Sequence, residues 1–188
     1  MPRIEHLTDR SQLPTEQHVE YDFIFDTLHR VGGPFGILLH SPGLAEKVCR
    51  AGKQVRLGSD ITMIERELAL LSTSREKDAS YEWATHVEIA RREGMSEDAI
   101  VAIRENRSTD DLALEEKEII DYTRTLLRTN RVPQDMFDAL IERHGPRWVV
   151  EITATIGQYQ YIAAINNAFE VEPKSGGEVL PIPMPNAG

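Results

Sequence analysis

The sequence predicts an all-α fold, and three observations support that class. Apolar residues recur every three or four positions in one segment after another, which is the spacing of an amphipathic helix. Runs of alternating Val, Ile, Thr and aromatic residues, which would predict strands, are absent. Gly and Pro separate the periodic segments, where helices begin and end. The 188 residues are enough for one domain with a core of its own.

The predicted elements follow one another along the chain with short connections. We expect an irregular N-terminal arm over residues 1–13, a single all-α domain over residues 14–171 and an extended Pro/Gly-rich tail over residues 172–188. Within the domain, the expected helices cover residues 14–30, 42–57, 62–75, 81–93, a short segment after Ser96, 114–129, 133–144 and 146–169, with a short element over 35–40.

Capping residues indicate where several of these helices begin. Ser41 stands where an N-cap belongs, and Pro42 follows it in the first turn. Thr62 and Glu65 have the spacing of a capping box, which predicts a well-defined helix start.

The helix that contains Tyr81 has its own boundary signals. Asp78 or Ser80 is expected to cap its start, and Gly94 follows its last turn in the position of a left-handed residue. A further break is expected between His144 and Pro146.

The helix over residues 146–169 is apolar nearly all round, which predicts a place in the middle of the molecule. One polar row interrupts it, formed by Glu151, Thr155 and Gln158. The tail that follows cannot continue the helix, because it is rich in Pro and Gly. We expect it to be mobile or to lie on a neighbouring subunit.

Charge and cysteine usage exclude several classes of function. The net charge of −10 argues against nucleic-acid and membrane partners, which would require clustered Lys and Arg. Cys49 is the only cysteine, so an intrachain disulfide, a Cys-x-x-Cys pair and a thiolate zinc site cannot form. The sequence contains neither a secretory signal nor a run of about 20 apolar residues, and we expect a cytoplasmic protein.

Two carboxylates and one histidine stand on faces that should be buried. Glu82 and His86 lie one turn apart, on the flank of an apolar stripe that includes Trp83 and Val87. Glu67 falls inside the apolar stripe of the preceding helix. Acidic side chains are seldom buried without a partner, so acids on an inward face call for a structural or functional explanation. Carboxyl and imidazole groups clustered in a low dielectric can hold and pass protons near neutral pH, as general acid/base catalysis requires.

Two other interpretations of this cluster remain open. It could be a structural polar cluster without chemistry. Two carboxylates and a histidine can also hold Fe or Mn. However, helical bundles usually supply Glu-x-x-His twice, whereas this chain has Glu-x-x-x-His once, and we therefore expect no metal.

Four residues are candidates for contacts with a small-molecule substrate. His40 stands in an apolar context that could line a pocket, and Gln158 and Tyr159 lie on the final helix. Trp83 neighbours the cluster, although such a ring more often belongs to a core.

Three segments carry a resemblance to a known family: Ile64-Glu65-Arg66-Glu67-Leu68-Ala69, Tyr81-Glu82-Trp83-Ala84-Thr85-His86 and Gly94-Met95-Ser96. They resemble the carboxymuconolactone decarboxylase superfamily, which includes alkylhydroperoxidase D (AhpD). The resemblance extends from about His40 to Phe169. It implies an AhpD-like helical bundle that forms homotrimers or homohexamers.

In the peroxidase members, a Glu is followed on the next helix by Cys-x-x-Cys-x-x-x-His. With Glu67 and His86 as anchors, the two cysteine positions fall at Ala79 and Glu82. Peroxidases of this family need a thiolate and a resolving thiol, so we expect no thiol peroxidase activity.

The resemblance to the decarboxylase branch implies an enzyme that moves protons on a small acidic lactone without a cofactor. Glu67 and His86 match the family's proton-handling positions. Our hypothesis is that His86 acts as general acid or base, Glu82 orients it, and Glu67 donates to a developing oxyanion. Decarboxylation, isomerisation, hydration and lactone opening all fit. The alternative is a non-catalytic oligomeric scaffold or small-ligand binder that has kept the fold.

Overall fold

A computed structural model describes residues 2–173 and 175–182 of the chain. Within these residues the regular structure is helical, so the predicted all-α class is confirmed. Two short 3-10 turns, Arg10–Gln12 and Thr15–Gln17, precede the α-helices. The helices are α1 (His18–Leu28), α2 (Pro34–Leu38), α3 (Pro42–Leu57), α4 (Met63–Glu76), α5 (Ser80–Arg92), α6 (Glu97–Arg104), α7 (Leu114–Thr129) and α8 (Gln134–Phe169).

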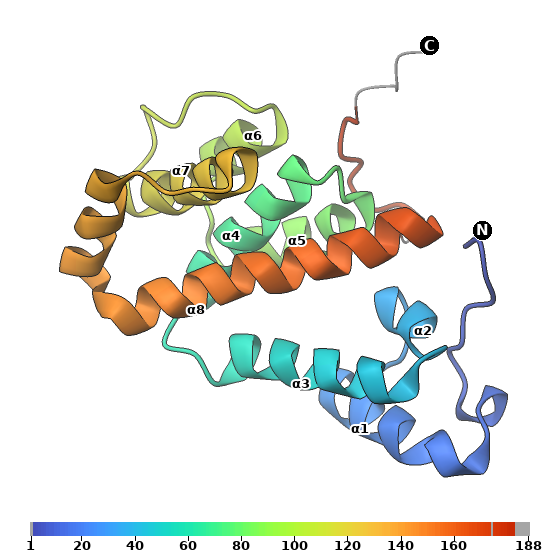
Figure 1. Ribbon diagram of the computed structural model, residues 1–188. Coiled ribbons are helices and arrows are strands. Elements are labelled where there is room, and N and C mark those ends of the chain that lie inside the picture. Colours follow the sequence, from blue (N-terminus) through green and yellow to red (C-terminus); the bar gives the residue numbers. More distant parts are fainter. Residues whose placement is uncertain (1, 174, 183–188) are drawn as a thin grey trace.

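The helices are arranged around α8, which crosses the whole molecule (Figure 1). Helices α4 to α7 lie on one side of it, and helices α1 to α3 lie on the other. Helix α8 contacts α4 and α5 in the first group and α2 and α3 in the second. The two groups therefore meet along this one helix.

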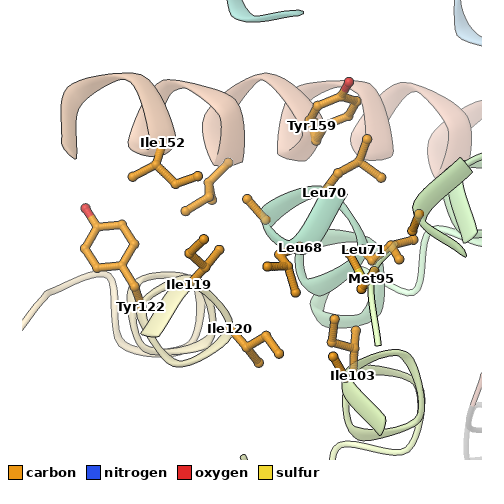
Figure 2. Packing of buried hydrophobic residues seen from close by; sticks show 14 of the residues in the cluster. Leu68, Leu70, Leu71, Met95, Ile103, Ile119, Ile120, Tyr122, Ile152 and Tyr159 are labelled. Atoms are coloured by element: carbon orange, nitrogen blue, oxygen red, sulfur yellow. The ribbon is translucent and has the colours of Figure 1, made fainter. Parts of the chain in front are cut away.

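Each group has its own hydrophobic core. The larger core lies between α4, α7 and α8, where Leu68, Ile119 and Ile152 are almost fully buried (Figure 2). Burial of one such side chain contributes roughly 1.5–3 kcal/mol, so this core accounts for much of the fold's stability. A smaller core around Ile24 and Leu39 holds α1, α2 and α3 together.

Helix α4 is more deeply buried than the central helix α8. Every residue of α4 from Arg66 to Arg75 is buried, including its polar ones. Among the described residues, the helices that contact α8 lie on two sides of it, and Val150 (67%) and Tyr161 (37%) of α8 are exposed. The apolar composition of α8 therefore predicted its place between the two groups of helices correctly, and part of its surface remains exposed.

Most helix boundaries agree with the capping signals. The Thr62 side chain accepts a hydrogen bond from the Glu65 amide, and Glu65 accepts one from the Thr62 amide, which confirms the capping box. Gly94 has φ 95° after the last turn of α5. Gly145, with φ 82°, bends α8 between its two predicted parts. Ser41 occupies the N-cap of α3, but its side chain makes no capping hydrogen bond.

The start of α5 differs from the expectation. Ala79 is its N-cap, and no side chain caps the helix. Ser80 is already the first helical residue, and Asp78 is turned away with φ 50° to form an ion pair with Arg75. A carboxylate held by a buried guanidinium is not available to accept from the helix amides.

Both terminal segments pack on the helical body. The arm is irregular, as expected, yet Leu7 and Leu13 are buried in the smaller core. In the tail, Leu180 is buried in the larger core, and Glu178 forms ion pairs with Arg91 and Arg104. Glu178 and Leu180 therefore hold residues 175–182 against their own chain rather than leaving them free, and a contact of the tail with a neighbouring subunit stays a prediction. The remainder of the predicted tail, residue 174 and residues 183–188, lies outside the described residues.

Within residues 2–173 and 175–182, no helix combines the length and apolar character that a membrane crossing requires.

Candidate functional site

Helices α4 and α5 place the two predicted carboxylates and the histidine together. The apolar stripe of α5 is anchored by Trp83 and Val87, which are fully buried. This orientation turns Glu82 and His86 toward α8 and toward α4. Glu67 projects from the enclosed central part of α4, and its side chain is 1% exposed. The local helical period thus decides which face each residue occupies.

The imidazole of His86 lies between the two carboxylates. Its Nδ1 is 2.8 Å from Glu67 Oε2, at hydrogen-bond distance. Its Nε2 is 3.6 Å from Glu82 Oε2, which allows an ion pair but is longer than a hydrogen bond. A carboxylate only accepts hydrogen bonds, so the Glu67 contact places a proton on Nδ1. The Nε2 atom is then the nitrogen that can take up or release a proton.

Each carboxylate has a further partner that fixes its position. Glu67 Oε1 lies 3.5 Å from Nε of Arg66, a buried guanidinium. Glu82 Oε1 accepts a hydrogen bond of 2.8 Å from Nδ2 of Asn166, which comes from α8. The three helices therefore contribute to one connected polar cluster with low exposure to water.

The cluster does not have the arrangement of a metal site. Glu67 and Glu82 contact opposite nitrogens of the His86 ring, so their oxygens cannot converge with one imidazole nitrogen on a single ion. Among the residues that the structure describes, no group of three or more His, Cys, Asp or Glu side chains could hold a metal ion.

A cavity of about 230 Å³ opens beside this cluster, at the border between the two groups of helices. His86 and Glu82 line it from α5, and Gln158 and Tyr159 line it from α8. Phe35 of α2 contributes an apolar wall. A space of this size fits a small organic molecule rather than a polymer.

Burial changes the acidity of the groups in the cavity. Removal from water raises the pKa of Glu82 above its usual value, although His86 and the Asn166 hydrogen bond act in the opposite direction. Burial, together with the carboxylates of Glu67 and Glu82, raises the pKa of Tyr159. Tyr159 therefore remains a neutral phenol that can donate a hydrogen bond. Its ring also contacts the His86 ring edge to face, with 5.8 Å between the centroids.

The structure brings together five of the seven residues that the sequence predicted for the site. Glu82, His86, Gln158 and Tyr159 line the cavity, and Glu67 stands behind His86 without lining it. A direct donation from Glu67 to a substrate, as the sequence suggested, does not fit this position.

The other two predicted residues lie elsewhere. Trp83 is fully buried in the larger core, because it belongs to the middle of the apolar stripe rather than to its flank. His40 lies outside the cavity, where its Nε2 is 2.8 Å from the Glu5 carbonyl oxygen. It holds the N-terminal arm in place.

Sequence reasoning did not identify two arginines of the cavity. Arg30 follows α1 and Arg56 lies near the end of α3, and the side chains of both line the cavity. Among the described residues, no carboxylate lies within ion-pair distance of either guanidinium. Neither position has a sequence signal, because the packing of α1 and α3 against α8 is what brings these residues to Glu82.

Cys49 has no place in this site. It is fully buried in the smaller core as a free thiol, and burial raises its pKa. A thiol with a raised pKa is a poor nucleophile at neutral pH, because little of it is thiolate.

Comparisons with known proteins agree with this fold. The model of the carboxymuconolactone decarboxylase family matches residues 42–122. An AhpD core structure, an uncharacterized peroxidase-related protein from Ralstonia eutropha JMP134, is 18% identical with a TM-score of 0.75, and 93% of each chain is covered. An uncharacterized peroxidase-related protein from Silicibacter sp. TM1040 is 15% identical with a TM-score of 0.72 and 87% of each chain covered.

One similar structure is that of an enzyme. The debrominase Bmp8 is 17% identical with a TM-score of 0.69, and 90% of this chain and 92% of that chain are covered. A variant of Bmp8 in complex with 2,3,4-tribromopyrrole is also similar, with a TM-score of 0.71. Among curated proteins, no match is found. Residues 42–122 of this chain thus match the carboxymuconolactone decarboxylase family model, and the chain as a whole has an AhpD-like fold with a single cysteine.

Proposed function

We propose that this protein is a cofactor-independent general acid/base enzyme that acts on a small organic acid or lactone. The observation that supports this most directly is the position of His86. One ring nitrogen is held by buried Glu67, and the other faces a cavity that also contains Glu82. This is the arrangement of a base whose proton-carrying atom is fixed and accessible.

The division of roles follows from these contacts. Glu67 orients the imidazole and stabilises its positive charge after His86 Nε2 has taken a proton from the carbon beside a carboxylate or lactone carbonyl. Glu82 in its acid form, or the neutral phenol of Tyr159, supplies the proton that the product requires. Movement of a double bond uses this pair directly. In addition of water and in hydrolytic lactone opening, the base takes its proton from water and the acid protonates the carbon or the leaving oxygen. In loss of carbon dioxide, the acid protonates the carbon that carbon dioxide leaves.

The two cavity arginines support an anionic substrate. Arg30 and Arg56 present positive charge to the cavity and have no carboxylate partner among the described residues. A planar guanidinium can hold a carboxylate through two parallel hydrogen bonds, which would orient the reacting carbon toward His86. The net charge of −10 would otherwise disfavour an acidic substrate, so these arginines provide the local attraction.

The proposal includes a homotrimer or homohexamer, which the family resemblance supports. The exposed apolar residues Val150 and Tyr161 on α8 offer a surface for such contacts. Sedimentation at the protein concentration of the activity assay would report a trimer or larger assembly if this is correct, and a monomer if it is not.

A substrate panel followed by NMR in deuterated water tests the proposed activity. Small lactones and unsaturated or keto acids would be incubated with the protein in the absence of thiols and hydroperoxides. We expect one of these compounds to be converted or to exchange hydrogen for deuterium. The His86→Gln variant should be slower by about two orders of magnitude or more, the scale of general acid/base catalysis.

Cys49→Ser is the matched control in the same experiment. It should retain activity, since the thiol lies in a separate core. Binding of panel compounds without conversion would favour the small-ligand binder over the enzyme. In a separate assay with added hydroperoxide and thiol, a reduction that depends on Cys49 would instead favour a peroxidase.

A further inference from the structure

The side-chain amide of Asn166 has an unused hydrogen-bonding group inside the site. Asn166 is 2% exposed, and its Nδ2 donates to Glu82 Oε1 at 2.8 Å. Its Oδ1 is buried and has no hydrogen-bond partner among the described residues. A buried polar atom without a partner lowers stability, because the atom has lost its hydrogen bonds to water. An asparagine at this position therefore needs an explanation beyond its contact with the carboxylate.

The Oε1 atom of Glu82 makes opposite demands on Asn166 when it is ionised and when it carries a proton. An ionised carboxylate only accepts hydrogen bonds, whereas a protonated carboxyl group has an O–H that donates. A side-chain amide carries a donor and an acceptor on the same carbon. A half-turn about the terminal torsion, which is broad and roughly two-fold for asparagine, exchanges their positions. The Oδ1 atom that now lacks a partner is the group that Glu82 requires when its proton is on Oε1, the oxygen that faces Asn166.

We infer that Asn166 is a positioning residue that holds Glu82 both as carboxylate and as carboxylic acid, turning its amide when Glu82 gains or loses a proton. Nδ2 donates to the carboxylate in one state, and Oδ1 accepts from the carboxyl O–H in the other. Glu82 then keeps its place beside His86 Nε2 throughout a cycle of proton transfer. In the proposed function this prevents the acid from turning away after it has taken up a proton.

Several charged and titratable groups face Glu82 and could change its protonation. His86 lies beside it on α5, Glu67 approaches from α4, Tyr159 from α8, and Arg30 from the connection after α1. Asn166 differs from all of them because it carries no charge, so its influence comes from hydrogen bonding alone. That difference makes its contribution separable in an experiment.

A pH titration by NMR tests the inference without any substrate. The protein would carry ¹³C-labelled glutamate and ¹⁵N-labelled asparagine, with the signals of Glu82 and Asn166 assigned from the variants Glu82→Gln and Asn166→Leu. We expect the side-chain amide signals of Asn166 to change with the same midpoint as the Glu82 carboxyl carbon. The nuclear Overhauser contacts from the amide protons to Glu82 should weaken in the protonated state.

Asn166→Leu and Asn167→Leu form a matched pair of variants. Asn167 is the exposed neighbour in sequence and donates to the Lys77 carbonyl oxygen, away from the cavity. Loss of the Asn166 donor should raise the titration midpoint of Glu82 by about one pH unit, which is a tenfold change in its acid dissociation constant. The reason is that a hydrogen bond to the charged carboxylate is stronger than one to the neutral acid. Asn167→Leu should leave that midpoint unchanged.

Three results would overturn the inference. The Asn166 amide signals could stay constant while Glu82 titrates. Glu82 could remain in one protonation state over the whole pH range in which the protein stays folded. Asn166→Leu could leave the Glu82 midpoint where it was. None of these results depends on turnover, so a failure of this inference is distinct from a failure of the proposed enzymatic function.

Discussion

His86 receives its orientation from a residue that stands nineteen positions earlier in the chain. The hydrogen bond from Nδ1 to Glu67 sets both the direction of the ring and the tautomer, leaving Nε2 toward Glu82 and the cavity. A carboxylate that is 1% exposed cannot exchange this partner for water. We therefore regard Glu67 as a positioning residue and His86 as the group that would exchange protons with a substrate.

Replacement of Glu67 by glutamine tests that assignment. A glutamine side chain can donate to Nδ1, which would shift the proton of the neutral ring to Nε2. Turnover in Glu67→Gln should fall by about a hundredfold or more, because the base would carry a proton at its reacting atom. Imidazole ¹⁵N shifts would report the tautomer directly. Normal turnover, or an unchanged tautomer, would contradict the assignment.

Replacement of Glu82 by glutamine tests the effect of burial on that carboxyl group. Burial raises the pKa of Glu82 above its usual value of 4.5, so the folded protein binds this proton more tightly than the unfolded chain. The wild type should therefore lose stability as the pH rises from the ordinary pKa through the raised one, and the loss should level off above it. Glu82→Gln cannot ionise, so its stability advantage over the wild type should grow over that range.

Denaturant unfolding at a series of pH values measures this difference. Glu88→Gln, an exposed glutamate on the same helix, is the control and should show no such trend. If the stability advantage of Glu82→Gln over the wild type stays constant or shrinks as the pH rises, burial does not control the pKa of Glu82.

At the residue scale, the sequence predicted which side chains point inward but not which of them contact one another. The period of α4 and α5 indicated that Glu67, Glu82 and His86 point inward, because this depends only on local geometry. Which carboxylate contacts which ring nitrogen depends on how the two helices cross. For this reason our sequence-based hypothesis gave the orienting role to Glu82, whereas in the structure Glu67 is the carboxylate at hydrogen-bond distance from the ring.

At the element scale, the start of α4 is important for the site. Glu67 reaches His86 only if α4 keeps its position relative to α5. The capping box of Thr62 and Glu65 satisfies two amides that would otherwise lack partners. Glu65 also accepts a hydrogen bond of 3.0 Å from the indole nitrogen of Trp148 on α8. The cap thus connects α4 to the helix that lines the cavity.

Thr62→Ala and Ser41→Ala should therefore behave differently, although both residues are N-caps. Loss of the Thr62 hydroxyl removes a capping hydrogen bond and should reduce stability by about 1 kcal/mol. Ser41→Ala should change stability very little, because its side chain makes no capping bond. Denaturant unfolding of the two variants gives the comparison. Equal losses would show that the capping contact at Thr62 is not the cause.

The contrast between these caps explains what element-level prediction can reach. The residue type and its spacing located the starts of α3 and α4 correctly, since N-caps depend on short-range geometry. The same reasoning placed a cap at Asp78 or Ser80, where the ion pair with Arg75 decides the local structure instead. A contact of that kind is not visible in a capping pattern.

At the scale of the whole molecule, the cavity exists because two groups of helices with separate cores meet along α8. Arg30 and Arg56 come from one group, and Glu82 and His86 come from the other. No local pattern predicts this meeting, which is why sequence reasoning did not identify the two arginines. The all-α class, by contrast, follows from helical periodicity summed over the chain.

The C-terminal tail packs against the larger core, and one substitution tests how much the tail contributes to the stability of the fold. Leu180 is 1% exposed in that core, so Leu180→Ala should reduce stability by about 2–3 kcal/mol. Val179→Ala is the matched control, because its side chain is 77% exposed and should matter by less than about 0.5 kcal/mol. Denaturant unfolding distinguishes them. Similar small effects would show that the tail does not belong to the folded core.

The most direct measurement of the central claim is a crystal structure of the protein with an acid or lactone from the substrate panel, or an unreactive analogue, bound. We predict that its carboxylate lies against Arg30 and Arg56 and that its reacting carbon faces Nε2 of His86 and the carboxyl group of Glu82. A ligand bound elsewhere on the molecule, or one in the cavity with its reacting carbon turned away from His86, would contradict the proposed chemistry.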